Sequence, residues 1–321
     1  MDIGPDTPVT LDPRVLEVLL GSWRSQIDGA LDVLLPLEGT ADSALAEGMR
    51  YAVLAGPGKR FRPLLCILAA RACGGEGSRA LPTACAIELL HACSLVQDDL
   101  PAMDHGTLRR GLPSCHVRYG EALTILVGDA LLAMALELVV RQRGAGLRPD
   151  GVMGVGVDLP PERVLALLQV LTGALGPLGL PAGQAADLAS EGRDIDPDTL
   201  VRIHTRKTGA LVEAAVVCGA LVAGADTPRV EALARYGAAL GRLYQIVDDI
   251  LSETGDGATL GKDPGSDRAR RKATYPRLYG LAGAQQAADD ALAAALGALT
   301  PFDHEAEPLR ALAIFARARR H

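Results

Sequence analysis

Two pairs of adjacent aspartates, each ending a mostly apolar stretch, are the residues of this chain whose types and spacing best suit chemistry. Asp98 and Asp99 follow ACAIELLHACSLVQ, and Asp248 and Asp249 follow ARYGAALGRLYQIV. Adjacent carboxylates at the end of a buried helix repel each other and are costly to desolvate unless a cation neutralises them. Their hard oxygen atoms suit magnesium, which binds through one or two carboxylates together with substrate phosphates. We therefore predict magnesium sites at both helix ends; the alternative is a solvated acidic helix end.

A further carboxylate, Asp104, belongs to the first cluster. It lies six residues after Asp98, a spacing that leaves the two far apart on an ideal helix. Pro101 cannot continue regular helical hydrogen bonding, so a bulge or turn there would bring Asp104 back. In the second cluster, Ser252 stands one turn after Asp248, where another carboxylate would complete a DDxxD motif.

Two clusters of cations flank the first acidic pair. Lys59, Arg60 and Arg62 crowd three positive charges in front of Pro63, which is well placed as the first residue of a helix. Clustered cations beside a helix N-terminus form an anion site, although a basic turn exposed to water is the simpler alternative.

The second basic cluster follows the carboxylates directly. Arg109 and Arg110 carry guanidinium groups whose fixed fork suits phosphate oxygens, so carboxylates for metal and arginines for phosphate form one predicted site. A structural salt bridge to Asp104 is the alternative. His91 lies seven residues before Asp98 and on nearly the same helix face, where a lone histidine is more often a core residue than a ligand.

Polar residues in the second half of the chain add candidates to this site. Lys207 and Thr208 lie near the start of a long apolar helix, and Gln245 lies one turn before Asp249. Upstream, Gln184 and Asp187 share one helical face and are expected to brace the core or to join the site.

The composition favours an all-helical fold. Hydrophobic residues make up 49% of the 321 residues, but aromatic residues only 3%, and Ala and Leu dominate the apolar set rather than the residues typical of strands. The formal charge of -7 argues against a nucleic-acid partner, because binding to a phosphate backbone requires excess Lys and Arg.

The chain reads as one domain, because no linker or repeat interrupts it. Helical periodicity runs over about residues 13–35, 43–54 and 118–140, after a mobile N-terminus at 1–12. Gly and Pro are frequent over 143–161, where we expect a loop.

The cysteines and the N-terminus predict a cytoplasmic protein. The six cysteines show neither a CxxC pair nor zinc-ligand spacing, so we expect free thiols in a reducing compartment. The segment MDIGPDTPVT lacks the basic and apolar regions of a signal peptide, and we expect that no apolar run reaches the length of a membrane span.

Taken in order, the motifs GPGKRFRP, DDLPAMD, LRRG, KTGAL and YQIVDD resemble those of the trans-isoprenyl diphosphate synthases, the polyprenyl synthetase family. Pro101 and Ala102, two extra residues in the first aspartate-rich motif, are similar to those of bacterial farnesyl and geranylgeranyl diphosphate synthases. The resemblance implies a single-domain all-α helical bundle around a deep apolar cavity. It also implies a homodimer that condenses isopentenyl diphosphate head-to-tail with an allylic diphosphate (dimethylallyl, geranyl or farnesyl).

The resemblance also implies roles for the candidate residues. The acidic residues would hold three magnesium ions, mainly through Asp98, Asp104 and Asp248, with Asp99 and Asp249 beside them. The allylic diphosphate would be gripped by Arg109, Lys207 and Lys262, and isopentenyl diphosphate by Lys59, Arg62, His91 and Arg110. Thr208 and Gln245 would turn oxygen dipoles towards the carbocation. These two residues, together with Lys207 and Arg109, form the expected catalytic set. The departing pyrophosphate would take the final proton.

Product length is expected to depend on the residue five before the first aspartate, which blocks elongation in the family when it is aromatic. Here it is Cys93, followed by Ser94, and both are small. The resemblance therefore predicts a chain beyond fifteen carbons, geranylgeranyl diphosphate, with farnesyl diphosphate as the alternative. Leu90 and Ile87, deeper on the same helix, would stop longer growth.

The sequence departs from the family pattern at several positions, which keeps two other functions open. Ser252 replaces an aspartate, Gln97 stands where a histidine is common, and residues 105–107 replace an acidic run. Weakened metal binding is expected, and a non-catalytic partner subunit of a heteromeric synthase is one alternative, although such subunits usually lose the first motif. A class I terpene cyclase would also use two acidic helix ends, but it would not need KRFRP or LRRG.

Overall fold

The structure, a computed structural model, describes residues 12–37, 43–142, 157–254 and 273–319. Most of the expected mobile N-terminus and of the Gly- and Pro-rich segment, and also Lys262, lie outside the described residues.

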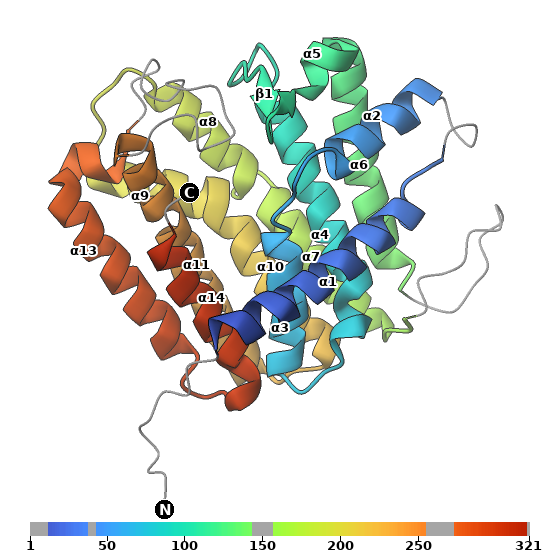
Figure 1. The fold of residues 1–321 in the computed structure, drawn as a ribbon, viewed down its shortest axis with the longest axis vertical. Coiled ribbons are helices and arrows are strands. Elements are labelled where there is room, and N and C mark those ends of the chain that lie inside the picture. Colours follow the sequence, from blue (N-terminus) through green and yellow to red (C-terminus); the bar gives the residue numbers. More distant parts are fainter. Residues whose placement is uncertain (1–11, 38–42, 143–156, 255–272, 320–321) are drawn as a thin grey trace, which may run out of the picture.

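The described chain is almost entirely helical, so the predicted all-α bundle is confirmed (Figure 1). Its helices are α1 (Pro13–Leu34), α2 (Ser43–Leu54), α3 (Phe61–Ala72), α4 (Gly77–Asp98), α5 (Cys115–Tyr119), α6 (Glu121–Val140), α7 (Pro161–Leu175), α8 (Leu180–Ser190), α9 (Pro197–His204), α10 (Ala210–Ala223), α11 (Thr227–Thr254), α13 (Tyr275–Ala298) and α14 (Glu307–Ala318). A π-helical turn, Thr205–Gly209, joins α9 to α10, and the 3-10 turn His304–Ala306 precedes α14.

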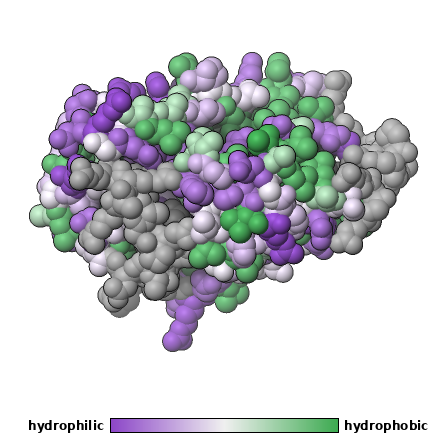
Figure 2. Space-filling view, turned by 90° about the horizontal axis from the view of Figure 1, so that it is seen from above, coloured by the Kyte–Doolittle hydropathy of each residue, from purple (hydrophilic) through white to green (hydrophobic). Residues whose placement is uncertain are grey.

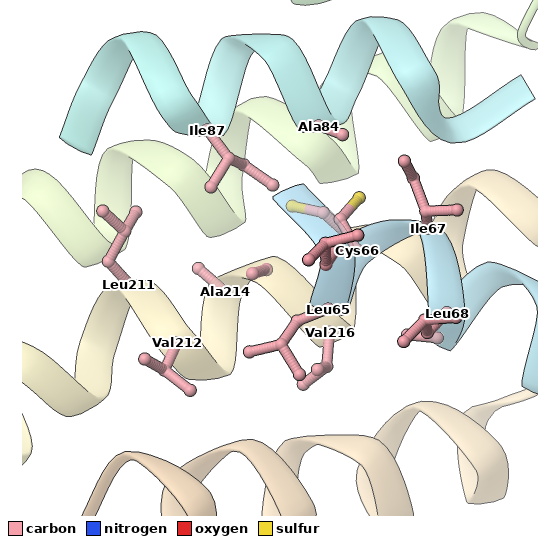
Figure 3. Packing of buried hydrophobic residues seen from close by; sticks show 14 of the residues in the cluster. Leu65, Cys66, Ile67, Leu68, Ala84, Ile87, Leu211, Val212, Ala214 and Val216 are labelled. Atoms are coloured by element: carbon pink, nitrogen blue, oxygen red, sulfur yellow. The ribbon is translucent and has the colours of Figure 1, made fainter. Parts of the chain in front are cut away.

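The core is packed around α3, α4 and α10, the three helices whose buried side chains meet in Figure 3. Small residues let these helices approach closely: a Cβ added at Gly219 of α10 would stand 2.1 Å from the main-chain oxygen of Cys66 in α3. All six cysteines are buried free thiols, as predicted. They pack as small apolar residues, and burial raises the pKa of Cys85 to about 12.

A short hairpin is the one described exception to the helical fold. Strands β1 (Leu108–Arg109) and β2 (Leu112–Pro113) pair antiparallel, with Arg109 opposite Leu112. The two residues between them, Arg110 and Gly111, have φ values of 55° and 77°. Positive φ at both central residues is the geometry that lets a two-residue turn match the twist of its strands. The turn sends Arg109 and Arg110 to different partners, which composition alone does not reveal.

Two expected helix boundaries differ from the structure. Pro63 is the third residue of α3 rather than its first, because the helix begins at Phe61 after Arg60, which has a φ of 48°. The helix expected over 118–140 is divided at Gly120, whose φ of 82° no helix can contain. It forms α5 and α6 instead.

Three described segments are long and apolar enough to cross a membrane by length and composition alone: Gly77–Asp98, Glu121–Val140 and Pro161–Ser190. The expectation that no apolar run reaches that length was therefore wrong. The most apolar window of α4 is 78% buried inside the bundle, which explains its hydropathy as core packing. That of α6 is only 39% buried.

Candidate active site

The first acidic cluster is built by the end of α4 and the turn after it. Asp98 is the last residue of α4, and Asp99 caps the helix. The N–H of Asp104 donates to the main-chain oxygen of Asp98 at 2.8 Å. The turn predicted at Pro101 therefore folds Asp104 back against the helix end.

Asp99 is committed to an arginine. Arg109 donates through Nε to Asp99 Oδ2 at 3.0 Å and through Nη2 to Oδ1. Asp99 is only 2% exposed, and Gly106 lies so close that an added Cβ would stand 2.6 Å from Oδ1. This two-pronged contact fixes the guanidinium plane of Arg109 beside the other carboxylates. A metal role for Asp99 stays a prediction.

Asp98 and Asp104 are less completely compensated. Burial, opposed by the attraction of Lys207 and joined by the charge of Asp104, raises the pKa of Asp98 to about 6. Lys207 Nζ lies 4.0 Å from Asp104 Oδ2 but 2.6 Å from Asp187 Oδ2. The lysine thus bridges α8 and the turn after α4, which brings Asp187 into the site.

The donor set of Asp98 and Asp104 fits magnesium. No three His, Cys, Asp or Glu side chains of the described ranges converge closely enough to hold a metal ion alone. Magnesium does not require such a cage, because it keeps several waters and completes its shell with substrate phosphates. A desolvated carboxylate with a raised pKa also gains from a nearby divalent cation, which favours its charged form.

The two aspartates of the second pair have different surroundings. Asp248 is half-buried, and its Oδ1 lies 2.7 Å from Nη2 of Arg319, the residue that directly follows α14. The Arg319 side chain is 5% exposed, and its guanidinium lies 3.7 Å from the centre of the Tyr244 ring. The desolvated arginine therefore neutralises the carboxylate that is expected to bind metal.

Asp249 is buried and faces the protein interior. Its Oδ1 accepts from Nε2 of Gln245 at 3.1 Å, and its Oδ2 accepts from the N–H of Tyr275 at 3.0 Å. His204 Nε2 lies 3.6 Å from the same Oδ2. Asp249 thus ties α11 to α9 and to the start of α13.

Lys207 and Thr208 lie on the π-helical turn between α9 and α10. Such a turn displaces its side chains from the regular helical rows and often marks a functional position. Gly183 of α8 permits close packing here, because an added Cβ would stand 2.2 Å from the main-chain nitrogen of Lys207. Thr208 Oγ1 donates to Oε1 of Gln245 at 2.9 Å, so the two expected carbocation-facing residues are in contact.

A second basic group, formed by Arg62 and Arg110 around His91, lies beside α4 about two turns below its acidic end. Arg62 Nη1 lies 3.2 Å from Nε2 of His91. Burial, followed by the charges of Arg62 and neighbouring arginines, lowers the pKa of His91 well below 6.5. His91 is therefore neutral, and because arginine only donates, Nε2 accepts and Nδ1 carries the proton. Within the described residues, the buried Nε of Arg62 has no hydrogen-bond partner. Such a cluster fits an anion.

One carboxylate, Glu88, lies beneath these cations. Its Oε1 is 2.6 Å from Arg60 Nη1 and 3.6 Å from Arg110 Nη2. Asp28 holds Arg60 from the other side at 2.7 Å, and the Val53 oxygen accepts from both arginines, at 2.9 Å from Arg60 and 3.2 Å from Arg110. Arg60 is thus a buried structural residue, whereas Lys59, its neighbour in sequence, is exposed.

The expected chain-length residues line α4 below the carboxylates. Cys93 and Ser94 are 5% and 8% exposed, whereas Leu90 and Ile87 are fully buried. The deep apolar cavity stays a prediction, with its closed end at Leu90. A cavity of about 420 Å³ lies elsewhere, lined by the turn between α3 and α4, the start of α7 and the end of α10.

The sequence interpretation overlooked Glu88 and Arg319. Glu88 could have been found from the sequence, because it is a charged residue inside an apolar helix, three positions before His91. A carboxylate buried there needs a cationic partner. Nothing in the sequence connects Arg319 with Asp248, 71 positions apart, since only the packing of α14 on α11 brings them together.

Comparison with known proteins identifies the family. The polyprenyl synthetase family model matches residues 42–312. The chain is 41% identical to a dimethylallyltranstransferase of Fischerella ambigua over 303 residues, covering 94% of this chain and 83% of that protein. It is 42% identical over 294 residues to geranylgeranyl pyrophosphate synthase 12, chloroplastic, of Arabidopsis thaliana, covering 90% and 78%. The crystal structure of an FPP/GFPP synthase from Zymomonas mobilis superimposes with a TM-score of 0.80 at 31% identity, covering 94% of this chain and 99% of that one.

A helical bundle with two acidic helix ends and adjoining cation clusters defines a prenyl-transferring enzyme of the isoprenoid synthase fold. The chain belongs to the polyprenyl synthetase family and is a short-chain trans-prenyl diphosphate synthase. The resemblance inferred from its motifs is thereby confirmed.

Proposed function

We propose that this enzyme condenses isopentenyl diphosphate head-to-tail with an allylic diphosphate in the presence of magnesium, and that it releases geranylgeranyl diphosphate. The observation that carries the proposal is that one site holds two separate groups of cations. Arg109 and Lys207 lie among the carboxylates, where a metal-bound diphosphate fits. Arg62 and Arg110 form the second group beside His91, which lies two turns before Asp98 on α4, and a second diphosphate would bind there without metal.

The allylic diphosphate is held where its leaving group is best stabilised. Asp99 fixes the fork of Arg109, and Asp187 fixes Lys207, so both cations are oriented before substrate binds. Asp98 and Asp104 would hold magnesium, which supplies charge neutralisation to the departing pyrophosphate when bound. The bond between the allylic carbon and the diphosphate oxygen breaks and leaves a carbocation.

Isopentenyl diphosphate is held by the second group of cations. Neutral His91 orients Arg62 through its Nε2 atom and retains an N–H on Nδ1 for the substrate. The double bond of isopentenyl diphosphate attacks the carbocation, and a carbon–carbon bond forms. Thr208 and Gln245 present oxygen atoms to the positive charge, and the released pyrophosphate takes the final proton, so no protein base is required.

Product length follows from the small residues on α4. Cys93 and Ser94 leave room where an aromatic side chain would end the cavity, which supports a product of twenty carbons. The relatives named as geranylgeranyl pyrophosphate synthases agree with this length. Farnesyl diphosphate is the second candidate, because the Zymomonas mobilis relative of known structure is named an FPP/GFPP synthase.

The proposal is tested by incubating the purified chain with isopentenyl diphosphate and allylic primers of five, ten and fifteen carbons, with and without magnesium. We expect magnesium-dependent elongation to twenty carbons. Lys207→Met should abolish activity, whereas Arg71→Met, which removes a half-exposed cation paired with Glu305 outside the site, should retain it. A wild-type chain inert with every primer at high magnesium would support a partner subunit instead, and a cyclic hydrocarbon product would support a cyclase.

We also propose that the enzyme is a homodimer that pairs through α5 and α6. Val117, Ile125 and Leu126 on these helices are each about half exposed. Figure 2 shows apolar residues gathering on the side of the molecule where α2, α5 and α6 lie in Figure 1. A second copy would cover this surface, since contiguous exposed apolar residues mark interfaces. Light scattering should give twice the chain mass, and Leu126→Glu should reduce it to one.

A cytoplasmic location is proposed on the chemistry of the cysteines. All six are reduced and buried, which suits a reducing compartment. Cell fractionation with an antibody to the chain tests this, and recovery in a membrane or secreted fraction would contradict it.

A further inference from the structure

Thr208, Gln245 and Asp249 form a chain of hydrogen bonds with a fixed direction. Thr208 Oγ1 lies 2.9 Å from Gln245 Oε1, and Gln245 Nε2 lies 3.1 Å from Asp249 Oδ1. The far end of the chain is anchored, because Asp249 Oδ2 accepts the main-chain N–H of Tyr275 at 3.0 Å. Two of the three side chains are expected to face the carbocation; Asp249 lies behind them and is 5% exposed.

The chemistry of the three groups determines where each proton lies. An ionised carboxylate only accepts hydrogen bonds, so the amide group that faces Asp249 must be the NH₂ of Gln245. The amide oxygen of Gln245 then faces Thr208, and because that oxygen also only accepts, the Thr208 hydroxyl must donate. Its proton points at Gln245, and the lone pairs of Oγ1 are left to face elsewhere.

This direction matters for a reaction that passes through a cation. A hydroxyl whose oxygen faces a carbocation stabilises it, whereas the same hydroxyl with its proton turned towards the cation repels it. We propose that Asp249 is a positioning residue that acts through Gln245 to aim the lone pairs of Thr208 at the carbocation. The inference rests on the proposed condensation, and it assigns Asp249 a role other than binding magnesium.

The surroundings of the two neighbouring aspartates support this division. Asp248 has a 35% exposed side chain, whereas the Asp249 side chain is 6% exposed and both of its oxygens already accept hydrogen bonds. His204 also approaches Oδ2, at 3.6 Å, from α9. Elements on three sides therefore hold the Asp249 carboxylate in one orientation.

Asp249→Asn tests the direction of the chain with a nearly isosteric change. The N–H of Tyr275 is fixed by the backbone, so the single oxygen of the asparagine turns towards it. The asparagine NH₂ then faces Gln245, whose amide must flip and present its own NH₂ to Thr208. The Thr208 hydroxyl becomes an acceptor, and its proton turns away from Gln245.

The measurement compares steady-state condensation by the full chain in four forms: wild type, Asp249→Asn, Thr208→Val and the double variant. We expect Asp249→Asn to lower kcat about tenfold to a hundredfold, with little change in the KM of either substrate or in the magnesium concentration for half-maximal rate. Once Thr208→Val has removed the hydroxyl, Asp249→Asn should lower kcat less than it does in the wild type, because only the flipped amide of Gln245 is left to act on the carbocation.

Other outcomes overturn the proposal. If the effects of the two substitutions multiply, Asp249 does not act through Thr208. If Asp249→Asn raises the magnesium requirement as Asp248→Asn does, it binds metal. If the thermal midpoint falls while kcat is unchanged, its role is only structural. Where Asp249→Asn does not fold, Gln245→Leu cuts the same chain and leaves the Tyr275 contact. Its loss of kcat should be smaller in the Thr208→Val background, and an equal loss there would overturn the proposal. Each of these outcomes leaves the wild-type chain able to elongate primers. A wild-type chain that does not elongate them would instead contradict the proposed function.

Discussion

Replacing Glu88 by glutamine should destabilise the enzyme far more than the same change at the surface. The side chains of Glu88 and Arg60 are both 2% exposed and lie 2.6 Å apart. Removing one partner of such a buried pair costs about 3–5 kcal/mol, because the other charge is left uncompensated in a poorly solvated place. Asp28 remains 2.7 Å from Arg60 and glutamine retains an acceptor, so we expect about 3 kcal/mol, the lower end of that range.

The assay is chemical denaturation at a fixed protein concentration, which reports the free energy of unfolding. Glu305→Gln is the matched control, because Glu305 and Arg71 form a 3.3 Å pair with side chains 39% and 31% exposed. Exposed pairs contribute about 0–1 kcal/mol, so the control should change stability little. The double variant Arg60→Met/Glu88→Leu should recover stability relative to Glu88→Gln, since the buried Arg60 charge is removed together with its partner.

The reasoning would be refuted if Glu88→Gln and Glu305→Gln cost the same. A functional effect should accompany the loss of stability. Glu88 also lies 3.6 Å from Arg110, so its neutralisation removes a carboxylate that orients that guanidinium and should raise the KM for isopentenyl diphosphate more than it lowers kcat.

Three more predictions concern product length, metal and pH. Cys93→Tyr should shorten the product by at least one five-carbon unit in chromatography, and an unchanged product would place the end of the cavity elsewhere. Arg319→Gln frees Asp248 from a cation 2.7 Å away and should tighten magnesium binding to the free enzyme about threefold to tenfold in calorimetry, whereas weaker binding would contradict the competition. Burial lowers the pKa of His204 from 6.5 to about 4, so the folded state favours its neutral form. The neutral His204 therefore contributes about 3 kcal/mol to the free energy of unfolding above pH 6.5, and this contribution is lost as the pH falls towards 4. His204→Gln should flatten this acid-induced loss of stability. An equal slope of unfolding free energy against pH in both proteins would refute the prediction.

The helical bundle itself was predictable from local patterns. Ala- and Leu-rich periodic segments form the helices, and Pro13, Ser43 and Leu54 bound α1 and α2 where expected. The turn at Pro101 also followed from local chemistry, because proline cannot continue the hydrogen bonding of α4. The hairpin was missed, since a two-residue turn at Arg110 and Gly111 has no hydrophobic periodicity to reveal it.

The types of residue in the site were also readable from the sequence. Paired aspartates at apolar helix ends indicate metal binding, and adjacent basic motifs indicate phosphates, whatever the surrounding fold. Asp98, Asp104 and Lys207 do gather in the structure. Arg60 illustrates the limit, because in the sequence it is equivalent to its neighbour Lys59.

The sequence by itself determined which chemistry this protein carries and in what order its motifs occur, because residue type and local spacing specify helices, turns and charge. Only the tertiary structure decided which cationic side chain pairs with which carboxylate. Packing assigns Arg60 to Glu88, Arg319 to Asp248 and Asp249 to the interior, since each of these contacts joins different elements of the fold. Burial then separates Arg60, whose side chain is 2% exposed, from Arg109 and Lys207, whose side chains are 25% and 22% exposed.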